Sequence, residues 1–347
     1  MSVIDRLLKY NFAPGSCMPA SASLLLTGRC NLRCGMCSFW RTAPERDQID
    51  ETVWADALEQ LRDMGVDSIS FQGGEPTLYR GIEQLACRAS GLGFRDRQVI
   101  TNGTLPAVLE RLLPYLSIIT FSLDSIHGGV HDGIRGVPGT GDRVRETMLA
   151  FVKKIPVRWA MVIQEKNHRE VDEALSFASA NGIREMVLAL VAGATVSDSA
   201  YADEKLYRHI GNMEKSSVRG WYNRNAPRIQ PSLYDTMLAF RRYRTTFVHR
   251  CDEPGTTVII LPDGGVHICC GNLPPVGNIR NDSLRSIWSR PETGKIMREA
   301  RNGMLSPCRS CQHVRTYFNA KAIVYNVLFS PRMAFTDYFL YRLLGRR

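Results

Sequence analysis

The sequence has no long apolar run and no long basic block. No segment reaches about 18 consecutive apolar residues, the length that a membrane-spanning helix needs, so we expect no transmembrane helix. No run of lysine and arginine is long enough for a nucleic-acid arm, and we expect no nucleic-acid partner. Residues 1–17 carry charges inside their short apolar stretch, a poor match to a secretory signal. These absences favour a cytoplasmic protein.

The net charge is nevertheless strongly positive. The 347 residues include 44 Lys and Arg against 34 Asp and Glu, a formal charge of +10. Such an excess suits an acidic partner, a phosphate-rich ligand or a membrane surface, and an ordinary solvated basic surface explains it equally well. Charge therefore selects no partner. The length and the 44% hydrophobic content fit one large domain with an appendage, or two domains.

Short β-rich runs alternate with helical patterns over the first part of the chain. The expected strands are residues 23–28, 67–74, 97–103, 117–124, 157–163 and 185–191. The expected helices, which have apolar residues at helical spacing, are residues 51–65, 81–93, 105–116, 141–155 and 169–182. Six such β/α repeats predict an α/β fold with a parallel sheet that curls into a full or partial (β/α)6 TIM-like barrel.

Polar residues and glycines follow four of these strands, and in barrels the chemistry lies at the C-terminal ends of the strands. They are Cys30 with its neighbours, then Gly73, Gly74 and Glu75, then Asn102, and finally Ser122 with Asp124. Packing does not explain such residues at several neighbouring strand ends. We therefore expect a functional site at this mouth of the barrel.

Three of the ten cysteines crowd into CNLRCGMC, as Cys30, Cys34 and Cys37. In a large chain without secretory features, clustered cysteines more often bind metal or act catalytically than form disulfides. Three thiolates can hold a [4Fe–4S] cluster and leave one iron open to a substrate, whereas a zinc ion would need a distant fourth ligand. Cys17 and Cys87 stand apart, and we expect each to be a buried small residue.

This cysteine spacing after the first strand resembles the signature of the radical S-adenosylmethionine (SAM) enzymes, and the resemblance covers most of residues 21–191. It implies that the open iron binds the amine and carboxylate of SAM. It also implies that one electron, from a donor such as flavodoxin or ferredoxin, cleaves SAM to a 5′-deoxyadenosyl radical, which takes a hydrogen atom from the substrate. The cofactors carry this chemistry, and the protein positions and shields them.

FQGGEP resembles the GGE motif of the family. The resemblance implies that Gly73 and Gly74 let the backbone approach SAM, and that Glu75 accepts hydrogen bonds from its ammonium group. It also implies SAM contacts at three further residues at strand ends, Asn102, Ser122 and Asp124. For Asp124 a helix or turn cap is the alternative.

Arg135 in HDGIRGVPG resembles a recurrent arginine–glycine segment of the family. The resemblance implies a contact with the SAM carboxylate, and an arginine in a surface loop is the alternative. Met36 departs from the family pattern, in which the residue before the third cysteine is often aromatic. Phe39 or Trp40 is expected to contribute to adenine stacking instead.

The later cysteines surround an expected hairpin and helix. TTVIILPDGGVHICC (256–270) predicts a β-hairpin with a Pro-Asp-Gly-Gly turn. A helix over 281–300 follows, with Asp282 or Ser283 as its cap. The hairpin would bring cysteines from its two ends towards each other, and the helix would carry the chain on to a terminal CxxC pair.

Residues 249–315 resemble the twitch domain, the short form of the family's SPASM extension, because PDGGVHIC is followed by GNIRNDSLRSIW. The resemblance implies one auxiliary [4Fe–4S] cluster, with zinc as the alternative. The implied ligands are Cys251, Cys269, Cys308 and Cys311. Cys270 has three open roles: it replaces Cys269 as a ligand, it is an inert buried thiol, or it donates a hydrogen atom, as an epimerase requires.

We expect five segments along the chain. They are an N-terminal extension (1–20), a radical SAM partial barrel (21–191), a bridging segment (192–248), a SPASM/twitch-like domain (249–315) and an amphipathic basic tail (316–347). The tail either lies in a membrane interface, as a peripheral contact at the inner membrane face, or covers the barrel.

The resemblance implies an enzyme whose auxiliary cluster supports oxidation of the substrate, by dehydrogenation or cross-link formation. One alternative is epimerisation of a sugar, aminocyclitol or peptide, a second is modification of a lipid-linked substrate, and a third is a non-catalytic metal-binding or redox-sensing module. No obvious peptide-recognition domain precedes the barrel, which lowers the expectation of a peptide substrate. The sequence selects neither the substrate nor the oligomeric state.

Overall fold

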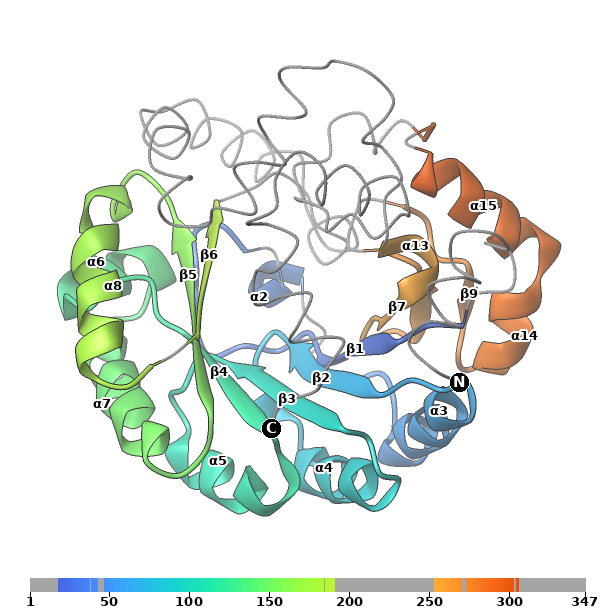
Figure 1. Cartoon of the computed structure of the whole chain (residues 1–347), viewed down its shortest axis with the longest axis horizontal. Coiled ribbons are helices and arrows are strands. Elements are labelled where there is room, and N and C mark those ends of the chain that lie inside the picture. Colours follow the sequence, from blue (N-terminus) through green and yellow to red (C-terminus); the bar gives the residue numbers. More distant parts are fainter. Residues whose placement is uncertain are drawn as a thin grey trace, which may run out of the picture.

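A curved sheet organises the part of the chain that the structure describes (Figure 1). The computed structural model describes residues 18–37, 39–42, 47–183, 185–190, 253–269, 273–302 and 304–305. The strands are β1 (Ser21–Thr27), β2 (Ser68–Gly73), β3 (Asp96–Thr101), β4 (Ile118–Ser122), β5 (Val157–Ile163), β6 (Glu185–Leu190), β7 (Thr257–Ile260), β8 (Gly265–His267) and β9 (Gly277–Asn278). They form one sheet of nine strands in the order β6-β5-β4-β3-β2-β1-β7-β8-β9.

Strands β1 to β6 pair in parallel, and helices cover the outer side of their curve (Figure 1). The outer helices are α3 (Glu51–Asp63), α4 (Ile82–Gly91), α5 (Pro106–Leu112), α6 (Gly128–Arg135), α7 (Thr140–Val152) and α8 (Val171–Ala180), while the short helix α2 (Phe39–Thr42) lies inside the curve. Three 3₁₀ turns accompany them, η2 (Pro76–Leu78), η3 (Leu113–Tyr115) and η4 (His168–Glu170). The predicted α/β fold with a partial (β/α)6 barrel is therefore confirmed.

The two faces of β1 enter different apolar clusters, because side chains alternate along a strand. Leu24 and Leu26 belong to the main core beneath the outer helices. Leu25 faces the other way and packs in a smaller cluster with Phe39 of α2 and with Ile259 from the C-terminal hairpin. The short helix α2, directly after the cysteine loop, is thus fixed to the inner face of the barrel.

The C-terminal hairpin is part of the barrel sheet. β7 pairs in parallel with β1, from Ser21 opposite Thr257 to Leu24 opposite Ile260, and β8 returns antiparallel to β7. The four-residue helix α13 (Glu253–Thr256) precedes it, and Gly264 takes a φ of +88° in the turn. The predicted hairpin is confirmed, but its pairing with the first barrel strand was not indicated by the sequence.

The single helix predicted over 281–300 is wrong. The structure has α14 (Leu284–Ser289) and α15 (Pro291–Arg301), separated by an extended Arg290 with φ −62° and ψ 138°. A residue before proline disfavours the helical region, which accounts for the break. The predicted cap is confirmed at Ser283, whose hydroxyl accepts the N–H of Ser286 at 3.2 Å.

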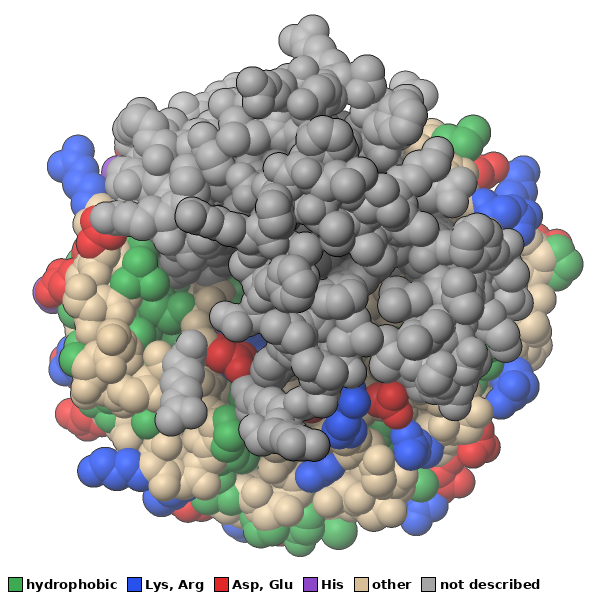
Figure 2. All heavy atoms as spheres, viewed as in Figure 1, with side chains coloured by type: hydrophobic (Ala, Val, Ile, Leu, Met, Phe, Trp, Pro, Cys, Tyr) green, Lys and Arg blue, Asp and Glu red, His purple; other side chains and the backbone are tan. Residues whose placement is uncertain are grey.

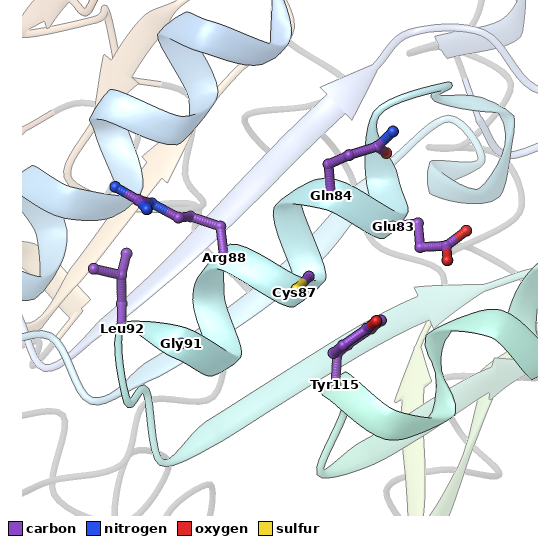
Figure 3. Close-up of a pocket in the computed structure, with 7 residues that line it drawn as sticks. All are labelled: Glu83, Gln84, Cys87, Arg88, Gly91, Leu92 and Tyr115. Carbon is purple, nitrogen blue, oxygen red and sulfur yellow. The ribbon is translucent and has the colours of Figure 1, made fainter.

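The expectation that Cys87 is buried is also wrong, because its side chain is exposed on α4. It lines an open pocket of about 730 Å³ between α4 and η3 (Figure 3). The other lining residues are Glu83, Gln84, Arg88, Gly91, Leu92 and Tyr115. The pocket lies on the outer side of the barrel and contains none of the expected site residues. Cys17 lies outside the described residues.

The described surface is mixed in charge where it can be seen. Figure 2 shows basic and acidic side chains interspersed along the edge of the described part on this face. Among the helices that the structure describes, none combines the length and the apolar character that crossing a bilayer requires. The bridging segment 192–248 and the tail 316–347 lie outside the described residues, so their predicted roles stay predictions.

Candidate active site

The three clustered cysteines lie on the loop that leaves β1 at the mouth of the barrel. Cys34 is buried, whereas Cys30 and Cys37 are partly exposed. The N–H of Cys37 donates to the carbonyl of Cys34 at 3.2 Å, which turns the loop back on itself. Burial raises the pKa of Cys30 to about 11 and also raises the pKa of Cys34. Such thiols ionise only when a metal or another positive charge compensates the loss of hydration.

Gly73 and Gly74 hold the start of this loop against the end of β2. The N–H of Gly74 donates to the carbonyl of Thr27 at 2.7 Å, and the N–H of Glu75 donates to that of Arg29 at 2.8 Å. A Cβ on Gly74 would lie 2.3 Å from the Arg29 oxygen, and Gly73 has a φ of +143°. The close approach that these glycines serve here is therefore with the backbone of the cysteine loop.

The C-terminal end of α6 holds the loop from the other side. The N–H of Arg33 donates to the carbonyl of Arg135 at 2.9 Å, and the N–H of Gly35 donates to that of Ile134 at 3.2 Å. Gly136 ends the helix with a φ of +75°, and a Cβ there would lie 2.3 Å from the Arg33 oxygen. Helix α6 was not among the predicted helices, although Arg135 was singled out in its last turn.

Glu75 is a fully buried carboxylate that is surrounded by neutral donors. One of its oxygens accepts from the Thr77 N–H at 3.1 Å, the Thr77 hydroxyl at 2.5 Å and the Thr101 hydroxyl at 2.7 Å. The other accepts from the Asn102 N–H at 2.7 Å. Burial raises the pKa of Glu75, although these hydrogen bonds oppose the rise. In the described part of the chain, no basic side chain pairs with it.

The side-chain amide of Asn102 is used within the protein. Its nitrogen donates to Asn31 at 2.7 Å and lies 3.9 Å from the sulfur of Cys30. Its oxygen accepts from the Thr104 hydroxyl at 2.7 Å, and Asn31 donates to that hydroxyl at the same distance. Sequence analysis missed Asn31, which directly follows Cys30, and Thr104, which is two residues after Asn102. A short polar residue near a motif is a weak signal.

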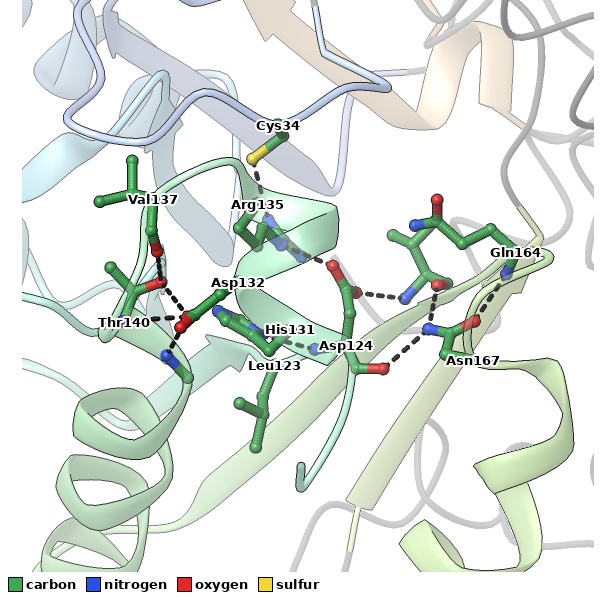
Figure 4. Close-up of polar contacts among 12 residues, drawn as sticks. Cys34, Leu123, Asp124, His131, Asp132, Arg135, Val137, Thr140, Gln164 and Asn167 are labelled. Carbon is green, nitrogen blue, oxygen red and sulfur yellow. Dashed lines mark hydrogen bonds and ion pairs between the residues drawn. The ribbon is translucent and has the colours of Figure 1, made fainter. Parts of the chain in front are cut away.

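Asp124 and Arg135 form a buried ion pair next to Cys34 (Figure 4). The guanidinium Nε donates to one Asp124 oxygen at 2.6 Å, and the Val162 N–H donates to the other at 2.9 Å. Arg135 Nη1 lies 3.8 Å from the Cys34 sulfur. Burial disfavours the charge on Arg135, but Asp124 and Cys34 raise its pKa above the usual value.

The structure does not support the alternative roles of these two residues, a surface-loop arginine for Arg135 and a cap for Asp124. Arg135 is not a surface arginine, since its side chain is only 11% exposed. Asp124 does not cap α6, whose N-cap residue is His127, and its carboxylate oxygens accept instead from Arg135 and from the Val162 N–H. Asn167 donates to the Asp124 carbonyl at 2.7 Å, and the Asp124 N–H donates to Nδ1 of His131 at 3.2 Å. The backbone of Asp124 is therefore as firmly held as its carboxylate.

Ser122 ends β4 at the same mouth and is partly exposed. Among the described residues, no hydrogen bond of its hydroxyl is found. Phe39 is packed in the apolar cluster of Leu25, which leaves no face for adenine. Trp40 donates from Nε1 to the Cys34 carbonyl at 3.0 Å and lies under the guanidinium of Arg41 at 4.3 Å.

The later cysteines are described only at Cys269. This residue follows β8 and is buried in the main apolar core. Four other cysteines of the predicted auxiliary site lie outside the described residues: Cys251, Cys270, Cys308 and Cys311. The auxiliary ligand set and the choice between Cys269 and Cys270 therefore stay predictions.

The donor set fits an iron–sulfur cluster better than a single metal ion. Within the described ranges, no three Cys, His, Asp or Glu side chains converge closely enough to hold one ion. A zinc site needs that convergence, whereas in a [4Fe–4S] cluster each thiolate binds a different iron. Cys30, Cys34 and Cys37 on one short loop supply the three thiolates that such a cluster needs.

Two family models match the chain, and both concern iron–sulfur proteins. Residues 24–178 match the Radical SAM superfamily, and residues 251–312 match SPASM, an iron-sulfur cluster-binding domain. The sporulation killing factor maturation protein SkfB of Bacillus subtilis (strain 168) is 27% identical over 307 residues, which cover 86% of this chain and 72% of that protein. The antilisterial bacteriocin subtilosin biosynthesis protein AlbA of the same strain is 28% identical over 296 residues, 80% of this chain and 61% of that protein.

A solved structure shares the fold. Streptococcus suis SuiB bound to precursor peptide SuiA superposes with a TM-score of 0.60 at 20% identity, over 82% of this chain and 68% of that chain. The two matched domains support a [4Fe–4S] cluster, SAM and auxiliary iron–sulfur binding as the cofactors, as the motifs predicted. The chain is an enzyme with a radical SAM domain and, after its barrel, a SPASM iron–sulfur domain.

Proposed function

We propose that this enzyme matures a peptide, by removing hydrogen from it with net oxidation. The main support for a SAM site is the environment of Glu75. This buried carboxylate lies beside the cysteine loop and has only neutral donors among the described residues. A desolvated carboxylate without a countercharge is a strong site for an ammonium group. SAM brings such a group together with a carboxylate.

The residues of the chain bind and orient in this proposal. Cys30, Cys34 and Cys37 would hold the cluster, which together with SAM would supply the radical chemistry for hydrogen abstraction from the substrate. Glu75 accepts hydrogen bonds from the SAM ammonium through the oxygen that carries only one described bond. The hydroxyl of Ser122 is a further donor or acceptor for SAM, while Asn102 and Asp124 keep the loop and the strand end in place.

The relatives support a peptide as substrate. SkfB is named for the maturation of a sporulation killing factor, AlbA for the biosynthesis of the bacteriocin subtilosin, and SuiB was solved with a precursor peptide. This chain spans 72% of SkfB and 61% of AlbA. The lower expectation of a peptide, which came from the sequence alone, is revised accordingly.

We keep the predicted division of the chain in this proposal, with the barrel at 21–191 and the auxiliary domain at 249–315. One auxiliary [4Fe–4S] cluster on Cys251, Cys269, Cys308 and Cys311 would take up the electron that a substrate radical gives on oxidation. The match of residues 251–312 to SPASM supports an iron–sulfur site in this segment. The number of clusters is the part of the proposal that iron analysis decides.

Anaerobic reconstitution tests both clusters. We expect about eight irons per chain, two clusters of four, and formation of 5′-deoxyadenosine with SAM and dithionite. The Cys30→Ala/Cys34→Ala/Cys37→Ala variant should keep roughly half the iron and make no 5′-deoxyadenosine. Cys87→Ala, which removes an exposed thiol outside both groups, is the matched control and should keep all of both. Full iron in the triple variant would contradict the two-cluster proposal.

Isotope transfer tests the substrate class and the type of reaction. Deuterated peptides, sugars and lipid-linked sugars are offered in parallel, and deuterium should pass into 5′-deoxyadenosine from a peptide only. The product should have lost a pair of hydrogen atoms, and Cys270→Ala should not change that loss. A product of unchanged mass whose formation stalls in Cys270→Ala would instead establish an epimerase.

A further inference from the structure

Arg135 is locked in place and points at a cluster ligand. It ends α6, its Nε is bound to Asp124 at 2.6 Å, and its Nη1 lies 3.8 Å from the sulfur of Cys34 (Figure 4). The second oxygen of Asp124 is held by the Val162 N–H at 2.9 Å. The guanidinium is therefore a rigid donor, oriented by a carboxylate that is itself fixed.

The sulfurs of Cys30 and Cys34 have different surroundings. The hydrogen-bond donors near the Cys30 sulfur are neutral: the Leu32 N–H at 3.4 Å and the Asn102 amide at 3.9 Å. Cys34 has a cation, the guanidinium of Arg135. Hydrogen bonds and charges at the sulfurs of an iron–sulfur cluster set its reduction potential, because the reduced cluster carries one more negative charge.

We propose that Arg135, oriented by Asp124, is a positioning residue that donates to the Cys34 sulfur and raises the reduction potential of the cluster on Cys30, Cys34 and Cys37. In this role it does not bind the carboxylate of SAM, which the sequence had implied. Asp124 limits the effect, since its negative charge offsets much of that of the guanidinium. The inference rests on the proposed function, in that a cluster occupies this loop.

Opposite charge changes at the two members of the pair should shift the potential in opposite directions. Arg135→Gln removes the positive charge and should lower the midpoint potential of the reconstituted cluster. Asp124→Asn keeps the arginine and the acceptor for Val162, removes the negative charge and should raise it. We expect each variant to change the equilibrium between oxidised and reduced cluster at least tenfold, which is about 59 mV for one electron.

Potentiometric titration followed by electron paramagnetic resonance, without SAM, measures these shifts. Arg135→Lys keeps the charge and should lie between the wild type and Arg135→Gln. The Asp124→Asn/Arg135→Gln double variant leaves no unpaired charge, so it keeps the test open if Arg135→Gln fails to fold, and its potential should lie between those of the two single variants. Arg158→Gln is the matched control, because it breaks an ion pair with Glu185 at the opposite end of the strands.

The outcomes separate the inference from the proposed function. Opposite shifts, with SAM affinity changed less than about threefold, would support the inference. Unchanged potentials, or a large loss of SAM affinity in Arg135→Gln at an unchanged potential, would overturn it in favour of a SAM contact. A wild type that takes up no cluster on this loop would overturn the proposed function, and the inference with it.

Discussion

The ends of β2 and β4 each place a fully buried carboxylate at the same mouth of the barrel, and the two are balanced in different ways. Glu75 after β2 accepts from two threonine residues and a backbone N–H, all of them neutral. Asp124 after β4 accepts from the guanidinium of Arg135 and from one backbone N–H. Both carboxylates are out of contact with water.

This difference separates a charge that the protein has cancelled from one that it has not. The ion pair with Arg135 compensates the negative charge of Asp124, so the end of β4 is balanced in charge without a ligand. Neutral dipoles reduce the cost of burying Glu75 but leave a net negative charge in a poorly hydrated site. A cationic ligand gains most at the second kind of site, which is why we assign the ammonium of SAM to Glu75 and not to Asp124.

The largest effect on stability should come from breaking the ion pair between Asp124 and Arg135. Arg135→Leu leaves Asp124 as an uncompensated buried charge, and such a loss costs about 3–5 kcal/mol of the free energy of unfolding. Adding Asp124→Asn removes that charge and keeps an acceptor for the Val162 N–H, so the double variant should recover most of the loss. Urea denaturation measures both. A double variant as unstable as Arg135→Leu would show that the pair does not interact as described.

A change at Glu75, at the end of β2, should affect the affinity for SAM more than the stability of the fold. Glu75→Gln removes the negative charge, and a hydrogen bond to a charged group contributes about 1.5–3 kcal/mol, so SAM should bind roughly 10- to 100-fold more weakly. Calorimetric titration of the reconstituted enzyme measures this. Glu83→Gln removes an exposed carboxylate on α4 and should bind SAM like the wild type. Equal SAM affinity in Glu75→Gln would refute the assignment.

Helix α6 carries Arg135, and two glycines between α6 and α7 provide a matched pair of variants. Gly136 and Gly139 have φ values of +75° and +76°, but only at Gly136 would a Cβ meet the Arg33 carbonyl, at 2.3 Å. Gly136→Ala should therefore cost about 1–3 kcal/mol more than Gly139→Ala, in the manner of an overpacked site. It should also lower the iron content, because the cysteine loop is displaced. Identical behaviour of the two variants would exclude the proposed anchoring of the loop.

The sequence predicts the barrel strands and the site around Glu75 better than the ion pair between Asp124 and Arg135. The six barrel strands were predicted to within two residues, because buried strands flanked by amphipathic helices leave a periodic pattern. Glu75 and the cysteines lie within short motifs. The partnership of Asp124 with Arg135 was not predicted, because eleven residues and an unrecognised helix separate the two. Helix α6 escaped because its sequence, GGVHDGIR, contains three glycines, which are poor helix formers.

Other misses arise where distant segments meet. The pairing of β1 with β7 joins residues more than 230 positions apart, and no local pattern records it. The neutral donors to Glu75 were missed for a similar reason, since Thr101 is brought from the neighbouring strand. Gly73 and Gly74 were recognised, but their close contact is with the backbone of Thr27 and Arg29. Sequence motifs identified what is chemically unusual, and the structure supplies the partner.

The smallest effect we expect is a pH dependence of stability with opposite signs at the two ends. His131 receives the Asp124 N–H and is fully buried, and burial followed by the charge of Arg135 lowers its pKa to about 4. Asp124 and Asp132 oppose that shift without reversing it. Because the unfolded chain takes up the proton first, the contribution of His131 is full above its usual pKa and is lost as the pH falls towards 4.

Glu75 acts in the other direction. Its pKa is raised, so the folded state binds a proton more readily than the unfolded state, and acid relieves part of the cost of burying the charge. Between about pH 7.5 and pH 5.5, His131 should account for a loss of about 1 kcal/mol in the free energy of unfolding. His131→Gln should flatten that dependence and Glu75→Gln should steepen it at the acid end. Urea denaturation at several pH values gives the slopes, which a uniform loss of stability does not change. Two slopes that shift in the same direction would mean that the buried charges at the ends of β2 and β4 are balanced alike.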